Sequence, residues 1–249
     1  MRVAVLADVH GNLPALDAVL VDAERAGVDA FVLNGDFVTG PMPAQTLDRL
    51  AALGDRVIWV HGNCEREVLH AYGGGISDGS QPSSVWATTE YAAAQLSPAH
   101  RNLIDDLPLS VRLDIDDLGP VRFCHATTRS DTEIVLVDSS VDRYREAFAS
   151  TSEATVVLGH THMPFDRLAD RRRFVNPGSV GMPYAGVPGA YWALLGPSVV
   201  LRRSEYDAEA AARLFRAQAP DYPGLAEFID ENLLSIPSDA EALAVFSKI

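Results

Sequence analysis

Short apolar runs alternate with amphipathic stretches through the first part of the chain. The runs at residues 3–7, 30–33 and 57–60 are continuous and mostly aliphatic, which predicts buried strands. Residues 13–26 and 44–53 instead place apolar side chains at helical spacing. This order of strands and helices predicts parallel strands with helices packed against their sheet.

The stretch between residues 73 and 108 breaks this alternation. It opens with a polar, glycine-rich segment at 73–84, which follows no predicted strand and lacks the GxGxxG spacing of dinucleotide sites, so we interpret it as a loop. Helical patterns follow at 85–95 and 98–107. We therefore expect residues 73–108 to form a helical insertion that overhangs the functional site and shapes its specificity.

The second half of the chain is richer in strand patterns. The strands predicted there are 110–115, 121–125, 155–158, 172–175, 190–195 and 198–203. A helix is predicted at 141–149, and helices at 208–218 and 224–234 are expected within a C-terminal helical extension that covers residues 206–249. Since no linker or internal repeat divides the sequence, we expect a single domain over residues 1–249.

Composition supports an ordinary globular enzyme-sized domain. Of 249 residues, 47% are apolar and 22% charged. The first apolar run is interrupted by Asp8 and His10 and no cleavage-like site follows, so we interpret it as a strand rather than a signal peptide. No apolar run of about 18 residues predicts a membrane span. The only cysteines are Cys64 and Cys124, which argues against a disulfide framework and favours a reducing cytoplasm.

The formal net charge of −14 bears on the partners that the chain can have. A general nucleic-acid binder is normally basic, so we expect no general binding of DNA or RNA and no membrane association. An anionic substrate would then need a local source of positive charge. Divalent metal ions would supply it.

Polar residues follow each of the three predicted parallel strands. Asp8-Val9-His10 ends the first strand, Asn34-Gly35-Asp36 the second, and His61-Gly62-Asn63-Cys64-Glu65 the third. Taken alone, each has an ordinary explanation, because Asp and Asn are common in turns and helix caps. Together they stand at the carboxyl ends of neighbouring strands, where open α/β sheets bind ligands.

Histidines follow two of the later strands. His125 ends one of them, and Gly159-His160-Thr161-His162 follows another. Histidine, aspartate and asparagine together suit first-row transition metals better than calcium. The candidate metal ligands are Asp8, His10, Asp36, Asn63, His125, His160 and His162.

These motifs stand in the order D-x-H, G-D, G-N, strand-end His and G-H-x-H, and in this respect the chain resembles the calcineurin-like metallophosphoesterases over about residues 1–205. The turn Asn176-Pro177-Gly178-Ser179 is similar to that of the small prokaryotic YfcE-type phosphodiesterase branch. The resemblance implies an α/β fold, a four-layer α/β/β/α sandwich of two mixed sheets. We expect the first half of the chain to form one sheet and the second half the other.

The resemblance also implies a pair of divalent cations. Asp8, His10, Asp36 and His162 would hold one, and Asp36, Asn63, His125 and His160 the other, with Asp36 bridging. Mn²⁺ is the first expectation, with Fe, Zn or Ni as alternatives. The implied reaction is hydrolysis of a small phosphate ester, more specifically a phosphodiester, by attack of a metal-bridging hydroxide. Asp36, Asn63 and His160 would be catalytic through the bound metals and phosphate.

One position departs from the family pattern. Many members carry a histidine after the G-N pair, where this chain has Cys64. A thiol is a weak hydrogen-bond donor with a pKa of about 8.5, so we expect a preference for good leaving groups, such as aryl phosphodiesters. Cys64, Arg66 and Arg129 are the candidate substrate contacts, although a solvated surface side chain explains either arginine as well.

Other functions remain as alternatives. A non-catalytic scaffold, like the retromer subunit that resembles this fold, would be expected to lose ligands, and here all seven positions keep one. Dinucleoside polyphosphate hydrolases and protein phosphatases usually carry the histidine that Cys64 replaces. The sequence leaves the oligomeric state and the physiological substrate open.

Overall fold

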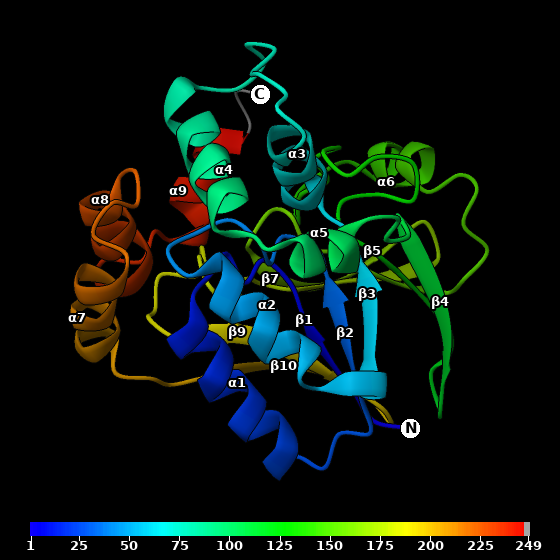
Figure 1. The fold of residues 1–249 in the computed structure, drawn as a ribbon. Helices are drawn as coiled ribbons and strands as arrows, with labels where there is room; N and C mark the ends of the chain where they lie inside the picture. Colours follow the sequence, from blue (N-terminus) through cyan, green and yellow to red (C-terminus); the bar gives the residue numbers. More distant parts are fainter. Residues whose placement is uncertain (247–249) are drawn as a thin grey trace.

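Two five-stranded sheets form the framework of the computed structural model, which describes residues 1–246 (Figure 1). The first sheet has the order β10-β9-β1-β2-β3. Its strands are β1 (Val3–Leu6), β2 (Ala30–Asn34), β3 (Val57–Val60), β9 (Ala190–Leu195) and β10 (Val199–Ser204). Strands β1, β2 and β3 are parallel, as the sequence predicts, and β9 runs antiparallel to β1.

The second sheet has the order β4-β5-β6-β8-β7. Its strands are β4 (Ser110–Ile115), β5 (Gly119–Cys124), β6 (Thr155–Val157), β7 (Pro164–Ala169) and β8 (Arg172–Pro177). The central three, β5, β6 and β8, are parallel, and the edge strands β4 and β7 are antiparallel to their neighbours. Both sheets are therefore mixed.

Alternation along β1 explains why the sheets stack. Successive side chains of a strand point to opposite faces. Val3 and Val5 pack into the layer between the two sheets, whereas Ala4 and Leu6 pack against the layer under α1 (Leu13–Arg25) and α2 (Pro43–Ala51). A third apolar layer lies between the second sheet and α6 (Val141–Ala147). The expected four-layer α/β/β/α sandwich is confirmed.

The expected division of the chain between the sheets is wrong for two strands. β9 and β10 come late in the chain but extend the first sheet beside β1, with Val3 opposite Leu195. The reason is burial on both faces of β9, since Trp192 belongs to the layer under α1 and Ala193 to the layer between the sheets. A strand of this kind needs a central position in a sheet.

The sequence predicted neither strand β7 nor a helix that begins at residue 239. Strand β7 begins at Pro164 and lies at the edge of its sheet, where a proline at the start of a strand is tolerated. Helix α9 (Asp239–Phe246) is short and follows a proline and a serine. Within residues 1–246, no helix combines the length and the apolar character that a bilayer span requires.

The helices between residues 63 and 104 stand above the ends of β2 and β3, and the helices between residues 208 and 229 lie to one side of the first sheet (Figure 1). After α3 (Asn63–Tyr72), the expected insertion folds into α4 (Ser83–Gln95) and α5 (Pro98–Ile104). The C-terminal extension forms α7 (Ala208–Gln218), α8 (Leu225–Ile229), the π-helix η2 (Asp230–Leu234) and α9. Its expected residues 247–249 lie outside the described part. The rings of Tyr91 on α4 and Tyr222 before α8 meet edge to face at 5.3 Å, so the two parts touch.

Candidate metal centre

The candidate ligands converge at the carboxyl ends of strands from both sheets. Asp8 and His10 follow β1, Asp36 follows β2, and Asn63 begins α3 after β3. On the second sheet, His125 follows β5, and His160 and His162 follow β6. The structure thus brings together two sets of donors that are far apart in the sequence.

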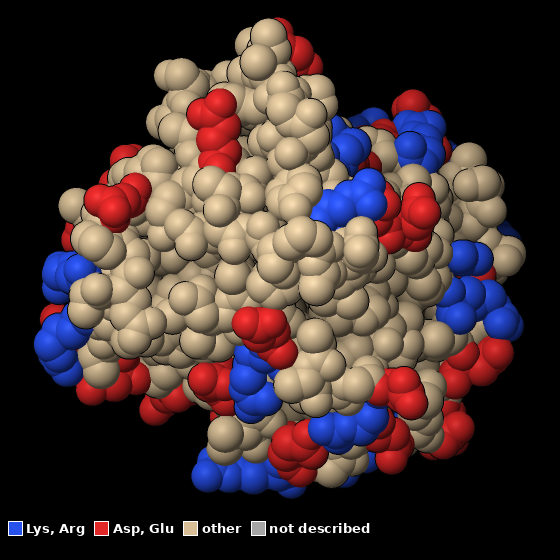
Figure 2. Space-filling view, in the orientation of Figure 1, with Lys and Arg blue, Asp and Glu red and all other residues tan. Residues whose placement is uncertain are grey.

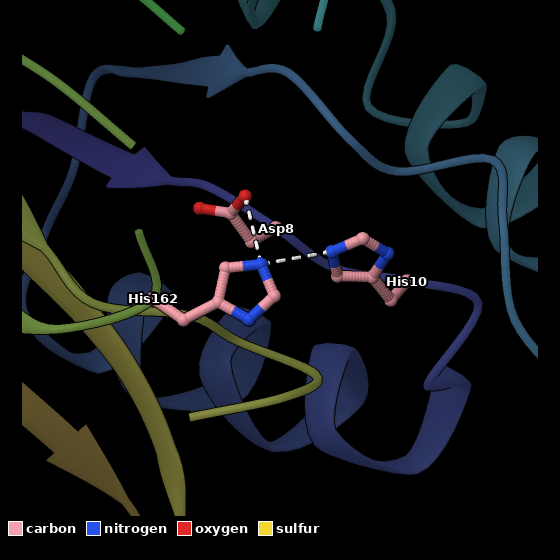
Figure 3. Close-up of side chains that lie close together, drawn as sticks. All are labelled: Asp8, His10 and His162. Carbon is pink, nitrogen blue, oxygen red and sulfur yellow. Dashed lines mark hydrogen bonds and ion pairs between the residues drawn. The ribbon is translucent and has the colours of Figure 1, made fainter. Parts of the chain in front are cut away.

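One group of donors consists of Asp8, His10 and His162. Nε2 of His162 lies 3.3 Å from Oδ1 of Asp8 and 3.1 Å from Nε2 of His10. Figure 3 shows the three side chains pointing toward one another from two different loops. Their ligand atoms all lie within 4.8 Å of one another, which is the spacing that one cation requires.

A second group consists of Asp36, His125 and His160, whose ligand atoms also lie within 4.8 Å of one another. Nε2 of His125 lies 3.3 Å from Oδ2 of Asp36. The same Oδ2 is 4.0 Å from Nε2 of His10, in the first group. Because the backbone N–H of Cys64 donates to Oδ1 at 2.9 Å, Oδ2 is the oxygen of Asp36 that faces both groups.

Hydrogen bonds fix the histidine rings. Nδ1 of His125 donates to the carbonyl of Asn34 at 2.9 Å, and Nδ1 of His162 donates to the carbonyl of Met182 at 2.7 Å. Nδ1 of His10 is 2.8 Å from the hydroxyl of Thr39. A carbonyl accepts but cannot donate, so Nδ1 of each ring carries a proton, and in the neutral form of His125 and of His162 the lone pair lies on Nε2, toward the centre.

Two buried atoms of the centre have no hydrogen-bond partner among the described residues: Oδ1 of Asn63 and Nε2 of His125. Such atoms are uncommon because leaving a buried polar group unpaired costs about 1–3 kcal/mol. Oδ1 of Asn63 has lone pairs, and Nε2 of His125, which lies 3.3 Å from Oδ2 of Asp36, has one when the ring is neutral; both atoms belong to the same predicted ligand set. The donor set therefore fits first-row divalent cations, which would satisfy both atoms.

Backbone strain is concentrated at the same residues. Among residues 1–246, nine residues other than glycine have positive φ, and five of them are Asp8, His10, Asp36, His160 and His162, with φ between 44° and 65°. Residues with a Cβ avoid this region unless the surrounding structure imposes it, and such strain gathers at functional sites. The strand ends are bent so that these side chains turn inward.

Glycines allow the loops to approach each other. A Cβ on Gly62 would lie 2.1 Å from Oδ1 of Asp36, and one on Gly35 would lie 2.4 Å from Nδ1 of His125. No side chain fits at either place. The glycines that precede Asp36 and Asn63 in the sequence are therefore required by close packing as well as by the turn.

Glu65 is a residue of the centre that the sequence analysis missed. Its fully buried carboxylate accepts the backbone N–H groups of Gly62, Asp36 and Phe37 at 2.7, 2.9 and 2.9 Å. It therefore ties the loop after β2 to the start of α3. The signal that could have revealed it is its position three residues after Gly62, where a glutamate commonly reaches back to the first amide of a helix.

The buried titratable groups of the centre shift one another's pKa values. Burial, and after it the neighbouring His162, lowers the pKa of His10 to about 4. Burial, and after it His125, lowers the pKa of His160 to about 4 as well. Burial also disfavours the charged form of His125, but the Asp36 carboxylate outweighs it and raises that pKa to about 10. Burial opposes ionisation of Asp36 in turn, and the ring of His125 holds its pKa well below the ordinary value. An anionic Asp36 is thus the electrostatic centre of the site.

The three candidate substrate contacts lie in different surroundings. Cys64 is buried, and its Sγ lies within 4.8 Å of ligand atoms of His10 and Asp36. Arg66 is half-exposed and pairs with Asp131 at 2.7 Å. The guanidinium of Arg129 is held by Glu133 at 2.6 Å. Their contact with substrate stays a prediction.

A cavity of about 320 Å³ opens beside the centre. His10, Asn63 and Cys64 form its floor, and most of the rest of its wall comes from the insertion and the C-terminal extension, with Thr39, Glu67 and Met182 added. A cavity of this size accommodates a small molecule. Residues 81, 84, 85, 88 and 89 of the predicted insertion line this cavity, and the role of the insertion in specificity stays a prediction.

Comparisons with known proteins agree on the family. The model of the calcineurin-like phosphoesterase superfamily domain matches residues 1–195. The phosphodiesterase YfcE of Escherichia coli is 24% identical over 209 residues, which is 78% of this chain and 87% of that protein. The uncharacterized protein MJ0912 of Methanocaldococcus jannaschii is 24% identical over 250 residues, which is 89% of this chain and 95% of that protein. The crystal structure of a metallophosphoesterase from Sphaerobacter thermophilus superposes with a TM-score of 0.73 at 25% identity, covering 94% of this chain and 99% of that one.

Proposed function

This chain belongs to the calcineurin-like phosphoesterase superfamily, and from that premise we propose that it is a phosphodiesterase that depends on two divalent cations. Asp8, His10, Asp36 and His162 would hold one cation. Asp36, Asn63, His125 and His160 would hold the other. Bound there, the cations would lower the pKa of a water molecule and polarise the phosphoryl oxygens.

The observation that carries this proposal is the arrangement of two donor groups around one carboxylate oxygen. Oδ2 of Asp36 faces both His125 and His10, at 3.3 and 4.0 Å. A shared carboxylate is the usual link in two-metal hydrolases. The unpaired Oδ1 of Asn63 and Nε2 of His125 support it, because a cation would satisfy each of them.

The protein's own part in the reaction is positioning and electrostatics. Asp36 stays anionic and, with Asp8, would offset part of the cations' charge, so that a net positive charge remains to attract a phosphate. Burial keeps His10 and His160 neutral at pH 7, because each has a pKa of about 4. Neutral imidazoles leave that positive charge intact.

A diester is favoured over a monoester by the surroundings of the centre. A diester carries one negative charge and a monoester close to two at neutral pH. Among the described residues that line the cavity, none is Lys or Arg. The described lining of the cavity therefore offers no positively charged side chain to pair with the second negative charge of a monoester.

Metal identity and compartment are part of the same proposal. Mn²⁺ is our first choice, and Fe, Zn and Ni are to be compared with it, because histidine and carboxylate ligands accept all four. Cys64 and Cys124 are both unpaired and buried, which supports a reducing compartment such as the cytoplasm.

The proposal is tested by metal analysis together with an assay. We expect about two Mn²⁺ per chain after reconstitution, and hydrolysis of bis(p-nitrophenyl) phosphate that stops when the metal is chelated. Asp36→Asn and His160→Ala should lose both metal and turnover while circular dichroism stays unchanged. Full metal binding without hydrolysis of any phosphate ester would instead indicate a scaffold.

A further inference from the structure

The cavity beside the metal centre is built by two parts of the chain that lie far apart in sequence. Gln81, Ser84, Val85 and the threonines of α4 form one side, and residues 222–232 form the other. The floor is made by His10, Asn63 and Cys64. A phosphodiester held at the metal centre would therefore place one of its two ester groups in this cavity.

Part of the cavity wall is apolar and aromatic. Tyr222 and Phe228 are buried, and their rings meet edge to face at 5.6 Å. Val85 and Met182 add aliphatic surface. Such a wall favours an organic group over a fully hydrated one, and aromatic faces also attract cations.

The rest of the wall is acidic. Glu227 on α8 and Glu231 on η2 line the cavity and are exposed, one helical turn apart. Within residues 1–246, neither makes an ion pair, although most arginines of the protein pair with a carboxylate. The buried Glu67 adds a third carboxyl group to the lining.

One basic group approaches the cavity, because the guanidinium of Arg66 lies 3.6 Å from Oε1 of the lining residue Glu67. The described lining residues include no Lys or Arg. On the face in Figure 2, red acidic groups stand over α4, and the blue groups of Lys and Arg lie over other parts of this face, at the margins as well as nearer the middle. Arg66 offsets the charge of Glu67, but Glu227 and Glu231 make no ion pair among the described residues. They give the cavity, away from the metals, a negative local potential, which attracts cations and repels further anionic groups.

We propose that this cavity binds the alcohol part of a phosphodiester that carries an amine or quaternary ammonium group. The phosphate would lie at the metal centre, the alkyl part against Tyr222 and Phe228, and the ammonium group near Glu227 and Glu231. This inference rests on the proposed phosphodiesterase function and adds the class of substrate. It also separates the protein from hydrolases of polyphosphate substrates, whose extra anionic groups the carboxylates would repel.

The test compares two esters of the same shape. The two esters are p-nitrophenyl phosphorylcholine and p-nitrophenyl 3,3-dimethylbutyl phosphate. Both release p-nitrophenolate, and their second groups differ only in that the positively charged nitrogen of choline is replaced by a neutral carbon. We expect kcat/KM of the Mn²⁺-loaded protein to be about tenfold higher for the choline ester. High salt should reduce this ratio, because the carboxylates are exposed.

Two variants locate the effect. In Glu227→Gln/Glu231→Gln the ratio should fall below about threefold. In the control Glu209→Gln/Asp230→Asn, which removes two exposed charges outside the cavity, one from α7 and one from η2, the ratio should keep its wild-type value. A wild-type ratio of one or less, or a ratio that survives in Glu227→Gln/Glu231→Gln, would overturn the inference.

Failure of the underlying function gives a different result. In that case neither ester would release nitrophenolate, although the protein is folded and holds its metal. Calorimetry would then still measure the affinities of the protein for phosphocholine and for 3,3-dimethylbutyl phosphate, and their comparison would show whether the cavity prefers the ammonium group. Equal affinities there would refute the inference independently of any turnover.

Discussion

The side-chain amide nitrogen of Asn63 lies 3.4 Å from Oε1 of Glu67, and this contact sets which end of the amide faces the metal ligands. The carboxylate can only accept, so the nitrogen points to Glu67 and the oxygen points away. That oxygen is buried and has no partner among the described residues. Nε2 of Gln81 donates to the same Oε1 at 2.8 Å, which holds Glu67 in place from the insertion.

Glu67→Ala should therefore weaken metal binding without removing a ligand. The amide of Asn63 would lose the acceptor for its nitrogen and could turn over, and partners of this kind are worth about 10–100-fold in metal affinity. Glu67→Gln keeps an acceptor oxygen, so its loss should be smaller. Mn²⁺ affinity is measured by competition with a chelator. Glu90→Gln, on the exposed side of α4, is the control, and an affinity of Glu67→Ala equal to that control would contradict the positioning role.

Glu65 should matter for stability as well as for the site. Removing a buried carboxylate that accepts three backbone N–H groups leaves these donors unpaired, and hydrogen bonds to charged groups contribute about 1.5–3 kcal/mol each. Burial and the charge of Asp36 raise the pKa of Glu65 to about 7, and this cost of ionisation offsets part of that contribution. We expect Glu65→Ala to lower the free energy of unfolding of the metal-free protein by about 3 kcal/mol. Urea denaturation measures this. A change below about 0.5 kcal/mol would show that the loops after β2 and β3 hold together without it.

The contrast between Glu65 and the metal ligands shows what the sequence could reveal. Asp36, Asn63 and His160 each stand next to a glycine directly after an apolar run, so a local pattern was enough to find them. The role of Glu65 depends on the amides of Asp36 and Phe37, which precede it by 29 and 28 residues, and it is visible only once the loops after β2 and β3 meet. Its one local signal, the position near a helix start, is shared by many ordinary glutamates.

The fold shows the same limit. Short apolar runs predicted β1, β2 and β3 closely, because parallel buried strands are continuous in apolar character. Which sheet β9 would join could not be read from its sequence, because its burial on both faces suits a central strand of either sheet. The pairing of Val3 with Leu195 joins distant parts of the chain, and no local pattern encodes it.

Metal binding should release a proton from His125. With Asp36 beside it, this histidine has a pKa of about 10 in the metal-free protein, so it is protonated at pH 7, and a ligand nitrogen must be neutral. His10 and His160, with pKa values of about 4, are already neutral there and release none. We expect release of about one proton per chain at pH 7–8, and a metal affinity that rises with pH toward pH 10.

Calorimetry of Mn²⁺ binding in HEPES and in Tris, which differ in ionisation enthalpy, gives the number of protons released. Zero protons at pH 7 would show that His125 is neutral before the metal arrives. The same shift predicts a trend for the metal-free protein. A raised pKa contributes stability in full below about pH 6.5, the value in the unfolded chain, and that contribution disappears as the pH rises through about 10.

Cys64 should make turnover sensitive to the leaving group. It lines the cavity beside His10 and Asp36, and burial, followed by the charge of Asp36, raises the pKa of its thiol well above the ordinary value. A neutral thiol that holds its proton this firmly is a poor acid for a departing alkoxide. Rates for a series of phosphodiesters should then fall steeply as the pKa of the leaving alcohol rises, and aryl diesters should exceed alkyl phosphomonoesters.

Cys64→His should flatten that dependence, because an imidazole in this position can donate a proton near neutral pH. We expect a gain of about tenfold for alkyl esters, below the 10²–10⁴-fold of an evolved general acid, and little change for p-nitrophenyl esters, whose leaving group needs no proton. Cys64→Ser is the matched control, since it keeps the size of the side chain without adding an acid of suitable pKa. A shallow dependence in the wild type, or one that Cys64→His leaves unchanged, would mean that another group assists the leaving alcohol or that its departure does not limit the rate.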